Sequence, residues 1–359
     1  MEIKEVQKLI KNINEKELQV PIMLVGATGI GKSGCLKELV KDTIKENKDF
    51  GFVDLRLATM ESTDLIGIPH NVEGRTLWAK PDWFPKEGTK GILALEEVNR
   101  ATDDVRQGVF QLLTEWRLHS HELPKGWSIV ALINPDNGQY QINQLDIAFK
   151  RRFVQLEVTS PSAVDWAIWG NKNGITPEMV MFVNQFPQVL TRTDDKVDID
   201  AINTPSGLEK LDILYREGCI PHSSLLEVAS GIIGREYAVV WLKSLKNKME
   251  SPLTAEDILN DFSKKKLKLA EQIKNKSNDL IYYTMTNLMA YTDEHKLKEK
   301  QIANLGEFLT MVSEEYCVTI IQNLIDNNAK NTDILTELSK NKELLGRIKG
   351  LMKDLKEIE

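Results

Sequence analysis

Between residues 26 and 33 the chain reads Gly26-Ala27-Thr28-Gly29-Ile30-Gly31-Lys32-Ser33, which fits the pattern G-x-x-x-x-G-K-[ST] at every fixed position. The apolar run 21–25 precedes it, and apolar residues at helical spacing follow it. Glycines allow backbone N–H groups to surround phosphate oxygens, and a helix N-terminus adds partial positive charge. Lys32 is expected to contact the outer phosphates, and Ser33 to bind Mg²⁺. The eight residues therefore predict a strand–loop–helix site for a nucleoside triphosphate.

The composition is that of an ordinary globular protein, with 359 residues, 28% of them charged, and a net charge of −7. This length allows two or three domains, and the acidic balance does not favour nucleic acid as a partner. Cys35, Cys219 and Cys317 are too far apart for a zinc or disulfide pattern, which suits a reducing cytosol. The sequence has no signal-peptide core or membrane-length apolar segment, so a cytoplasmic protein without membrane contact is expected.

Strand and helix patterns alternate through the first part of the chain. Four more apolar runs have strand character: 52–57, 91–95, 128–133 and 153–158. The spacing of the apolar residues in 105–116 predicts a helix between the second and the third of these runs. This alternation predicts an α/β fold with a parallel five-stranded sheet covered on both faces. We expect an α/β nucleotide-binding core over 1–159, a helical lid over 160–250 and a further helical C-terminal region over 251–359.

The run 92–95 ends in two carboxylates, Glu96 and Glu97. Such a strand directs one acid toward the Mg²⁺ shell and another toward the attacking water, so Glu97 is predicted as the general base. Glu96 is predicted to hold Mg²⁺ through water. Asp is usual at that position, and the extra methylene of Glu96 is expected to alter metal geometry and slow hydrolysis.

Two further motifs follow in sequence order. Asn134, in Ile133-Asn134-Pro135, comes directly after the fourth strand, where its amide can bond the γ-phosphate or the lytic water. Arg151 and Arg152 come just before the last strand, where an arginine can reach the nucleotide of a neighbouring subunit. These residues join Glu97 in the predicted catalytic set.

Motifs in this order resemble the AAA+ ATPases and, within them, the MoxR family, over roughly residues 18–245. The likeness is carried by 55–57 with 64–69, by Glu96-Glu97-Val98-Asn99-Arg100-Ala101, by 123–135, by 145–153 and by 231–241. The resemblance makes Arg152 the leading arginine finger, with Arg151 second, and implies the strand order 5-1-4-3-2. It also implies a ring, commonly a hexamer, with ATP between subunits, and chaperone-like work on a protein client, often one with a von Willebrand factor A domain.

Some residues depart from that resemblance or allow two interpretations. Ser206 stands where the lid's sensor arginine is expected, and Lys210 and Arg235 are candidates to replace it by charge alone. The insertion 70–85 holds Trp78, Trp83 and Phe84, which either grip a polypeptide or pack the insertion on its own core. The pair His119 and His121 is interpreted as a hairpin surface rather than a metal site.

The leading functional hypothesis is an ATPase that uses Mg²⁺ and ATP to remodel or activate a protein partner. A nucleic-acid motor or loader is the second, although the acidic balance disfavours it. A switch or scaffold with little turnover is the third, favoured by Glu96 and Ser206. A small-molecule kinase is the least favoured, because paired acids with an arginine finger argue against it.

Overall fold

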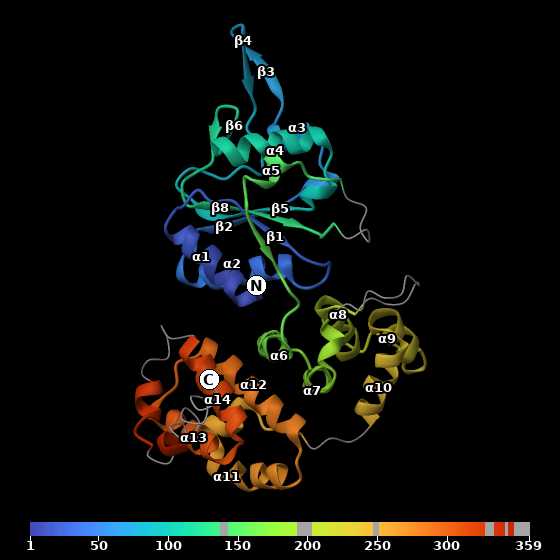
Figure 1. Ribbon diagram of the computed structural model, residues 1–359, viewed down its shortest axis with the longest axis vertical. Helices are drawn as coiled ribbons and strands as arrows, with labels where there is room; N and C mark the ends of the chain where they lie inside the picture. Colours follow the sequence, from blue (N-terminus) through green and yellow to red (C-terminus); the bar gives the residue numbers. More distant parts are fainter. Residues whose placement is uncertain (137–142, 192–202, 247–250, 327–333, 342–343, 348–359) are drawn as a thin grey trace. The chain divides into compact units, whose positions relative to one another are not determined.

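The computed structural model describes residues 1–136, 143–191, 203–246, 251–326, 334–341 and 344–347. These residues form two compact units, Met1–Ser160 and Pro161–Glu359. Figure 1 labels the helices and strands of each unit. The last part of the predicted C-terminal region, residues 348–359, lies outside the described residues.

A five-stranded parallel sheet is the centre of the first unit, in the order β2-β5-β8-β1-β9. Its strands are β1 (Ile22–Val25), β2 (Phe50–Arg56), β5 (Lys90–Glu96), β8 (Trp127–Ile133) and β9 (Val154–Glu157). Counted along the sheet from its last strand, this is the order 5-1-4-3-2. The predicted α/β class, the five strands and their order are therefore confirmed.

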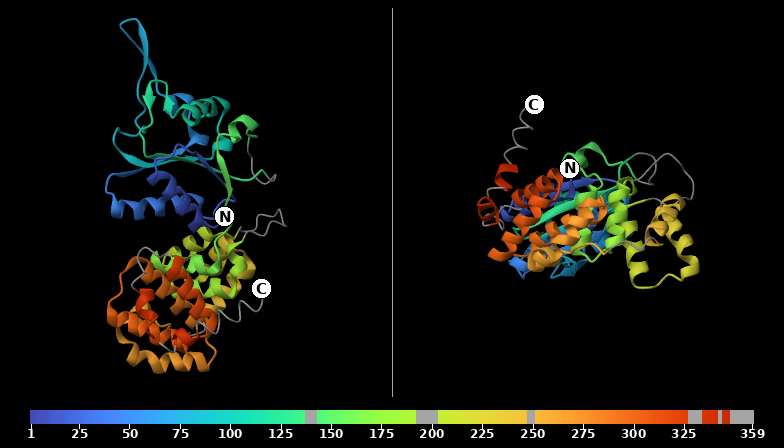
Figure 2. Two further views of the ribbon diagram at one scale, coloured as in Figure 1. Left: turned by 60° about the vertical axis from the view of Figure 1, so that its left-hand side comes forward. Right: turned by 90° about the horizontal axis from the view of Figure 1, so that it is seen from below.

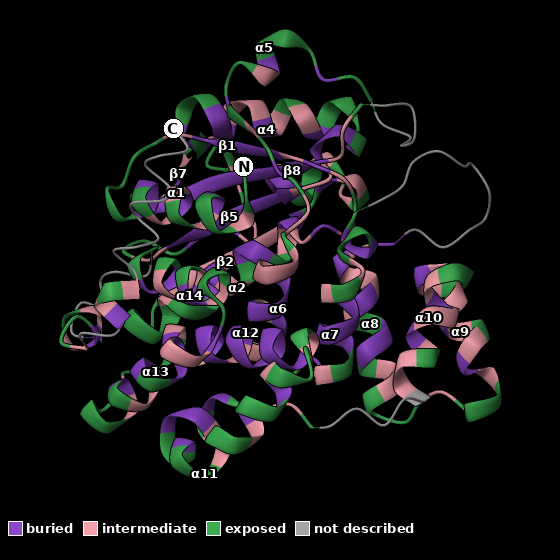
Figure 3. Cartoon of the chain, turned by 60° about the horizontal axis from the view of Figure 1, so that its bottom comes forward, coloured by how far each residue is buried: buried purple, intermediate pink, exposed green. Residues whose placement is uncertain are grey.

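Helices cover both faces of this sheet, because its strands alternate apolar side chains between two hydrophobic cores (Figure 1). On one face, α1 (Ile3–Glu15) and α2 (Lys32–Glu46) pack on Leu24, Ile92 and Val130. On the other, α4 (Asp103–Glu115) packs on residues of opposite parity, such as Leu93 and Ala131. Figure 3 shows the central strands β1, β5 and β8 as mostly buried, while exposed residues lie on the outer sides of the helices.

Between β2 and β8 the chain adds two antiparallel hairpins. The turn η1 (Leu57–Thr59) and helix α3 (Ser62–Ile66) lead into β3 (Pro69–Val72) and β4 (Arg75–Trp78), which project from the first unit (Figure 2, left). The second hairpin pairs β6 (Arg117–Leu118) with β7 (His121–Glu122). The turn η2 (Val98–Arg100) and helix α5 (Ile147–Lys150) complete this unit.

The second unit is helical throughout its described residues. Its elements are α6 (Ala163–Lys172), α7 (Pro177–Gln185), η3 (Pro187–Leu190), α8 (Pro205–Arg216), η4 (His222–Ser224), α9 (Leu225–Ile233), α10 (Arg235–Lys246), α11 (Ala255–Lys274), α12 (Asn278–Glu294), α13 (Glu299–Met311) and α14 (Glu314–Asp326). One hydrophobic core runs through it, from Trp166 in α6 to Leu344. The predicted lid and C-terminal region thus share a core across residue 250, and their division into two domains stays a prediction.

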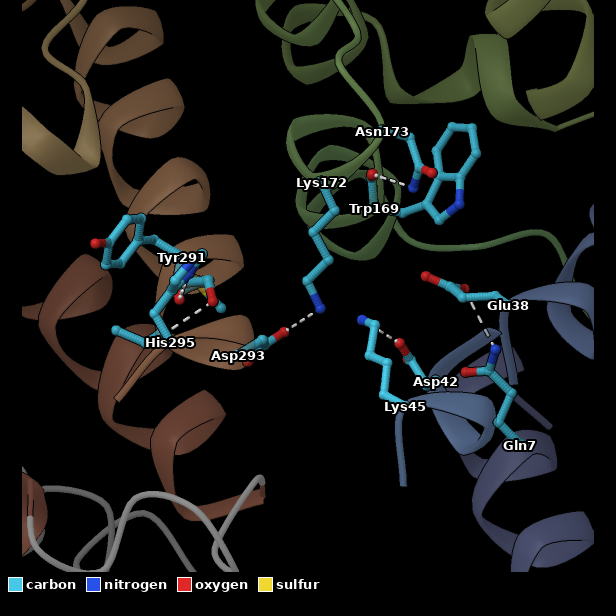
Figure 4. A network of polar contacts seen from close by, with 12 residues as sticks. Gln7, Glu38, Asp42, Lys45, Trp169, Lys172, Asn173, Tyr291, Asp293 and His295 are labelled. Atoms are coloured by element: carbon cyan, nitrogen blue, oxygen red, sulfur yellow. Dashed lines mark hydrogen bonds and ion pairs between the residues drawn. The ribbon is translucent and has the colours of Figure 1, made fainter. Parts of the chain in front are cut away.

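A polar contact joins the two parts of this core. Lys172 of α6 forms an ion pair with Asp293 of α12 at 2.7 Å, and the side chains are only 21% and 9% exposed (Figure 4). Helix α6 also packs along α12, where Asn171 donates a hydrogen bond to Thr286. The start of the predicted lid is therefore held against the predicted C-terminal region.

Candidate nucleotide site

The carboxyl ends of three neighbouring strands bring the predicted site residues together. In the parallel register Val25 of β1 pairs with Ile133 of β8, and Glu96 of β5 pairs with Leu132 of β8. The P-loop follows β1, the acid pair ends β5, and Asn134 follows β8. Ligands of open α/β sheets bind at this edge, so the sheet itself places these motifs side by side.

The P-loop has the backbone that its glycines predict. Gly29 and Gly31 have positive φ values of 81° and 106°, in the left-handed region that side chains disfavour. At Gly26 an added Cβ would lie 2.6 Å from Ile30 Cδ1 and 2.8 Å from the Val158 carbonyl oxygen. Gly31 also caps the N-terminus of α2, whose first helical residue is Lys32. The loop therefore presents backbone N–H groups beside a helix N-terminus, as phosphate binding requires.

Lys32 is buried in the loop, where its ammonium group has three oxygen partners. Its Nζ donates to the carbonyls of Gly26 and Ala27, at 2.6 and 2.8 Å, and to Asn134 Oδ1 at 3.3 Å. Burial lowers the pKa of Lys32 from 10.5 to about 8, while the charge of Glu96 acts in the opposite direction. A phosphate anion near this partly desolvated ammonium group would stabilise its charged form.

Asn134 follows β8, and its side chain connects the end of this strand with the P-loop. Its Oδ1 accepts from Lys32 Nζ and, at 3.2 Å, from Thr28 Oγ1. Its backbone carbonyl accepts from Asn99 Nδ2 at 2.9 Å. The amide predicted from the Asn-Pro motif therefore lies in contact with the lysine that is predicted to bind the outer phosphates.

The acid pair lies at a sharp turn. Glu96 is the last residue of β5, and Glu97 has φ 57° and ψ 36°, a left-handed conformation that is unusual for a residue with a side chain. The turn is held by hydrogen bonds from Glu97 N to Leu132 O and from Arg100 N to Glu97 O, at 3.0 and 2.8 Å. The Glu97 carboxylate is 40% exposed and lies 3.4 Å from Arg100 Nη1. Backbone strain of this kind concentrates at functional sites.

The two predicted arginines lie at the end of α5. The Asp146 side chain caps this helix by accepting from Phe149 N at 2.8 Å, and Arg151 and Arg152 follow its last residue. Both are exposed, and the Arg152 guanidinium lies over the Phe110 ring, 5.1 Å from its centroid. The structure shows their exposure but does not bring them to the P-loop of the same chain.

The residues present fit a nucleotide with Mg²⁺. Gly26 allows the loop to pack against Ile30 and the Val158 carbonyl in a way that a Cβ would prevent, and Lys32 offers a desolvated positive charge. Ser33 lies in the first turn of α2 and is partly exposed, as is Glu96 at the end of β5. One hydroxyl and one carboxylate, with water and phosphate oxygens, are the ligands that Mg²⁺ takes in such sites. The ion would neutralise phosphate charge when bound.

The aromatic residues of the insertion pack on the first unit. Phe84 is 5% exposed and belongs to its hydrophobic core, and Trp83 packs beside it while donating to Asp64 O at 3.1 Å. Trp78 stacks on His119, with ring centroids 3.8 Å apart, and its carbonyl lies 3.0 Å from His121 Nε2. Of the two interpretations of these aromatics, the structure favours packing. His119 and His121 are on a hairpin, as predicted, where they contact the other hairpin.

One residue of this region, Asn99, had no predicted role in the site, and the predicted lid-sensor position lies at the start of a helix in the second unit. Asn99 is 2% exposed and bonds Asn134, and no motif points to a contact between residues 35 positions apart. Ser206 is the second residue of α8, which Thr204 caps by accepting from Gly207 N at 3.0 Å, and Lys210 and Arg235 are exposed. The Thr-Pro pair that suggested a lid sensor thus starts a helix.

The sheet order, the P-loop after β1 and the acid pair after β5 define the class of AAA+ P-loop domains. Residues 21–153 match the family model of the AAA domain (dynein-related subfamily). The first unit is thus an AAA+ domain, as the sequence predicted, and AAA+ domains bind nucleotides. The narrower resemblance to MoxR proteins stays a prediction.

Several solved structures are similar to this chain at low identity. The RuvB Holliday junction branch migration motor from Thermotoga maritima is 12% identical, with a TM-score of 0.37, and the match covers 88% of this chain and 86% of that one. NtrX from Brucella abortus in complex with ADP is 13% identical, with a TM-score of 0.36, and the match covers 90% and 68%. A comparison with curated proteins gives no match.

The helices differ from membrane spans in length or in composition. Within the described ranges, no helix is both long and apolar enough to cross a membrane. The predicted cytoplasmic location stays a prediction.

Proposed function

We propose that this protein is a Mg²⁺-dependent ATPase that hydrolyses ATP to ADP and phosphate. The observation that carries the proposal is the contact of Asn134 with Lys32, at the strand edge where Glu97 stands in a left-handed turn. This arrangement sets a phosphate-binding cation, a sensor amide and a carboxylate on three neighbouring strand ends. Those are the parts that phosphoryl transfer to water requires.

Each residue then has one role. Lys32 and the P-loop N–H groups bind the phosphates, and Ser33 and Glu96 would hold the ion. Glu97 accepts a proton from the attacking water. The water oxygen forms a bond to the γ-phosphorus, and the bond between the γ-phosphorus and the oxygen that leaves with ADP breaks. Asn134 orients that water or the γ-phosphate, and Arg152, with Arg151 as the alternative, neutralises charge in the transition state of a neighbouring subunit.

The Glu97→Gln variant tests the assignment of the base. We expect turnover to fall by about 10²–10⁴-fold, because the amide cannot accept the proton, while ATP affinity stays unchanged. Phosphate release and titration calorimetry measure the two quantities. A variant that hydrolyses ATP at the wild-type rate would remove Glu97 from this role, and a wild type without turnover would refute the proposed function.

We further propose a homo-oligomeric ring, with six subunits as the expected number, in which Arg152 acts on the neighbour's nucleotide. Mixing Glu97→Gln with Arg152→Ala protein tests this, because each variant supplies what the other lacks. Random mixing at equal amounts should restore activity at ~25% of interfaces. Arg151→Ala in place of Arg152→Ala is the matched control, and an inactive mixture of the first pair excludes Arg152 as the trans residue.

The cycle is proposed to remodel or activate a protein client, such as one with a von Willebrand factor A domain. The described residues give little support to a nucleic-acid motor, since the basic run 264–266 is paired with acids. Lys264, Lys265 and Lys266 lie 3.5, 3.0 and 3.4 Å from Asp261, Asp257 and Glu307. Capture with Glu97→Gln protein and ATP tests the client, and recovery of nucleic acid alone would overturn it.

A further inference from the structure

Asn99 has a buried side-chain amide and lies close to the acid pair, and it has no role in the proposed hydrolysis of ATP. It is 2% exposed and lies in η2, two residues after Glu97. Its Nδ2 donates to the Asn134 carbonyl at 2.9 Å, while its Oδ1 is buried with no partner within the described residues. A buried acceptor without a partner costs free energy, so this side chain is not placed for stability alone.

The contact joins two strand ends that carry different parts of the site. The Glu97 turn is continuous with Asn99 through the bond from Arg100 N to Glu97 O, and the buried Val98 fixes its other side. The Asn99 carbonyl in turn accepts from Asn143 N at 2.7 Å. The bond from Glu97 N to Leu132 O is the last backbone bond between β5 and β8, and the bond from Asn99 to the Asn134 carbonyl adds a side-chain connection beyond it, between the turn of the predicted base and the predicted sensor amide.

We propose that Asn99 is a positioning residue that holds Glu97 and Asn134 in the mutual geometry needed for hydrolysis. The inference rests on the proposed function, because it presupposes that these two residues act on the same γ-phosphate. A small displacement of a positioned group lowers turnover strongly while it leaves phosphate binding by the P-loop intact. The expected signature is a loss in kcat without a loss in ATP affinity.

The same sheet provides a matched control at its opposite end. Asn14 of α1 is 6% exposed, and its Nδ2 lies within hydrogen-bond distance of Gly91 O, Gly126 O and Ser128 Oγ, at 2.9, 2.7 and 3.1 Å. It thus connects the amino ends of β5 and β8, as Asn99 connects their carboxyl ends. Removing either amide costs a buried hydrogen-bond donor, but only Asn99 is near the predicted chemistry.

The experiment compares Asn99→Ala with Asn14→Ala in the full chain. Asn99→Ala should lower kcat by about 10–100-fold with an ATP Kd within about threefold of wild type, and Asn14→Ala should change neither. Both are expected to lower the unfolding temperature. Equal kcat values for the two variants at matched stability would overturn the inference.

A second readout does not depend on turnover. Hydrogen–deuterium exchange at the amides of Glu97 and Arg100 should accelerate in Asn99→Ala and stay unchanged in Asn14→Ala. If the wild type fails to hydrolyse ATP, the proposed function fails, while this exchange still decides whether Asn99 holds the turn. Unchanged exchange would refute the inference even in an active enzyme.

Asn143→Ala covers the case in which Asn99→Ala does not fold. Asn143 is exposed, and its Nδ2 braces the same turn by donating to Ala101 O at 3.0 Å. Its removal should lower kcat in the same direction by a smaller factor, about threefold, because the bond from Asn99 remains. A kcat equal to that of the wild type, with exchange in the turn unchanged, would contradict the proposed brace.

Discussion

The two ends of the central sheet differ in how their polar groups are held. At the amino end Asn14 has three partners, Lys90 pairs with Glu17 at 2.6 Å, and Trp127 donates to Thr89. At the carboxyl end Lys32 is desolvated, Glu97 is in a left-handed turn, and the Asn99 side-chain oxygen is buried with no partner among the described residues. Glu17 at the amino end also has a positive φ, of 52°, so the two ends differ in the desolvated cation and the buried amide oxygen rather than in backbone conformation.

The largest effect is expected from a comparison of two lysine substitutions, one at each end of the sheet. Lys32→Ala should weaken ATP binding by at least about 100-fold, because the charge that contacts the outer phosphates is lost. Lys90→Ala removes an exposed ion pair, so ATP affinity should not change and the unfolding temperature should fall only slightly. Titration calorimetry measures the ATP affinity of the two variants, and thermal unfolding measures their stability. Equal ATP affinities in the two variants would contradict the assignment of nucleotide binding to the carboxyl end of the sheet.

Glycine substitutions should separate stability from binding. At Gly91 an added Cβ would collide with the Gly51 carbonyl oxygen, so Gly91→Ala should lower the free energy of unfolding by about 1–3 kcal/mol and leave ATP affinity unchanged in the folded fraction. Gly26→Ala should lower both the free energy of unfolding and the ATP affinity, because the added Cβ would collide with Ile30 and the Val158 carbonyl oxygen and distort the P-loop. Denaturant unfolding with and without ATP tests this pair, and a folded Gly26→Ala protein with normal affinity would contradict it.

The pH dependence of ATP binding should report the lowered pKa of Lys32. This pKa is about 8 in the free protein, and a bound phosphate favours the charged form, so binding takes up a proton above that pH. Affinity should be flat below pH 8 and fall by up to about tenfold per pH unit above it. Lys32→Arg is the control, since its charge persists, and the same slope in that variant would assign the effect to another group.

The smallest effect is expected at the hairpin contact. Burial and then the nearby His121 lower the pKa of His119 below 6.5, so the folded state binds this proton less tightly than the unfolded state. The stabilisation by neutral His119 is therefore present above pH 6.5 and is lost as the pH falls through the lower folded pKa. The protection factors of residues 69–78, which are corrected for the intrinsic pH dependence of amide exchange, should fall by about twofold between pH 7.5 and 5.5. His119→Gln should remove this dependence.

The sequence predicted those features that depend on neighbouring residues. Strand runs, the P-loop and the acid pair are local patterns, and the parallel sheet brings their ends together without further information. The β3–β4 strands were not predicted, because 69–78 is short and largely polar. The contacts of Asn99 with Asn134 and of Trp78 with His119 join residues far apart in the chain, which a pattern within one segment cannot reveal.

The shared core of the second unit has a mechanical consequence. Because α6 packs on α12 and Lys172 pairs with Asp293, a rotation of the predicted lid must carry the helices beyond residue 250 with it. Within the second unit, the helices on either side of residue 250 are therefore expected to move together as one body.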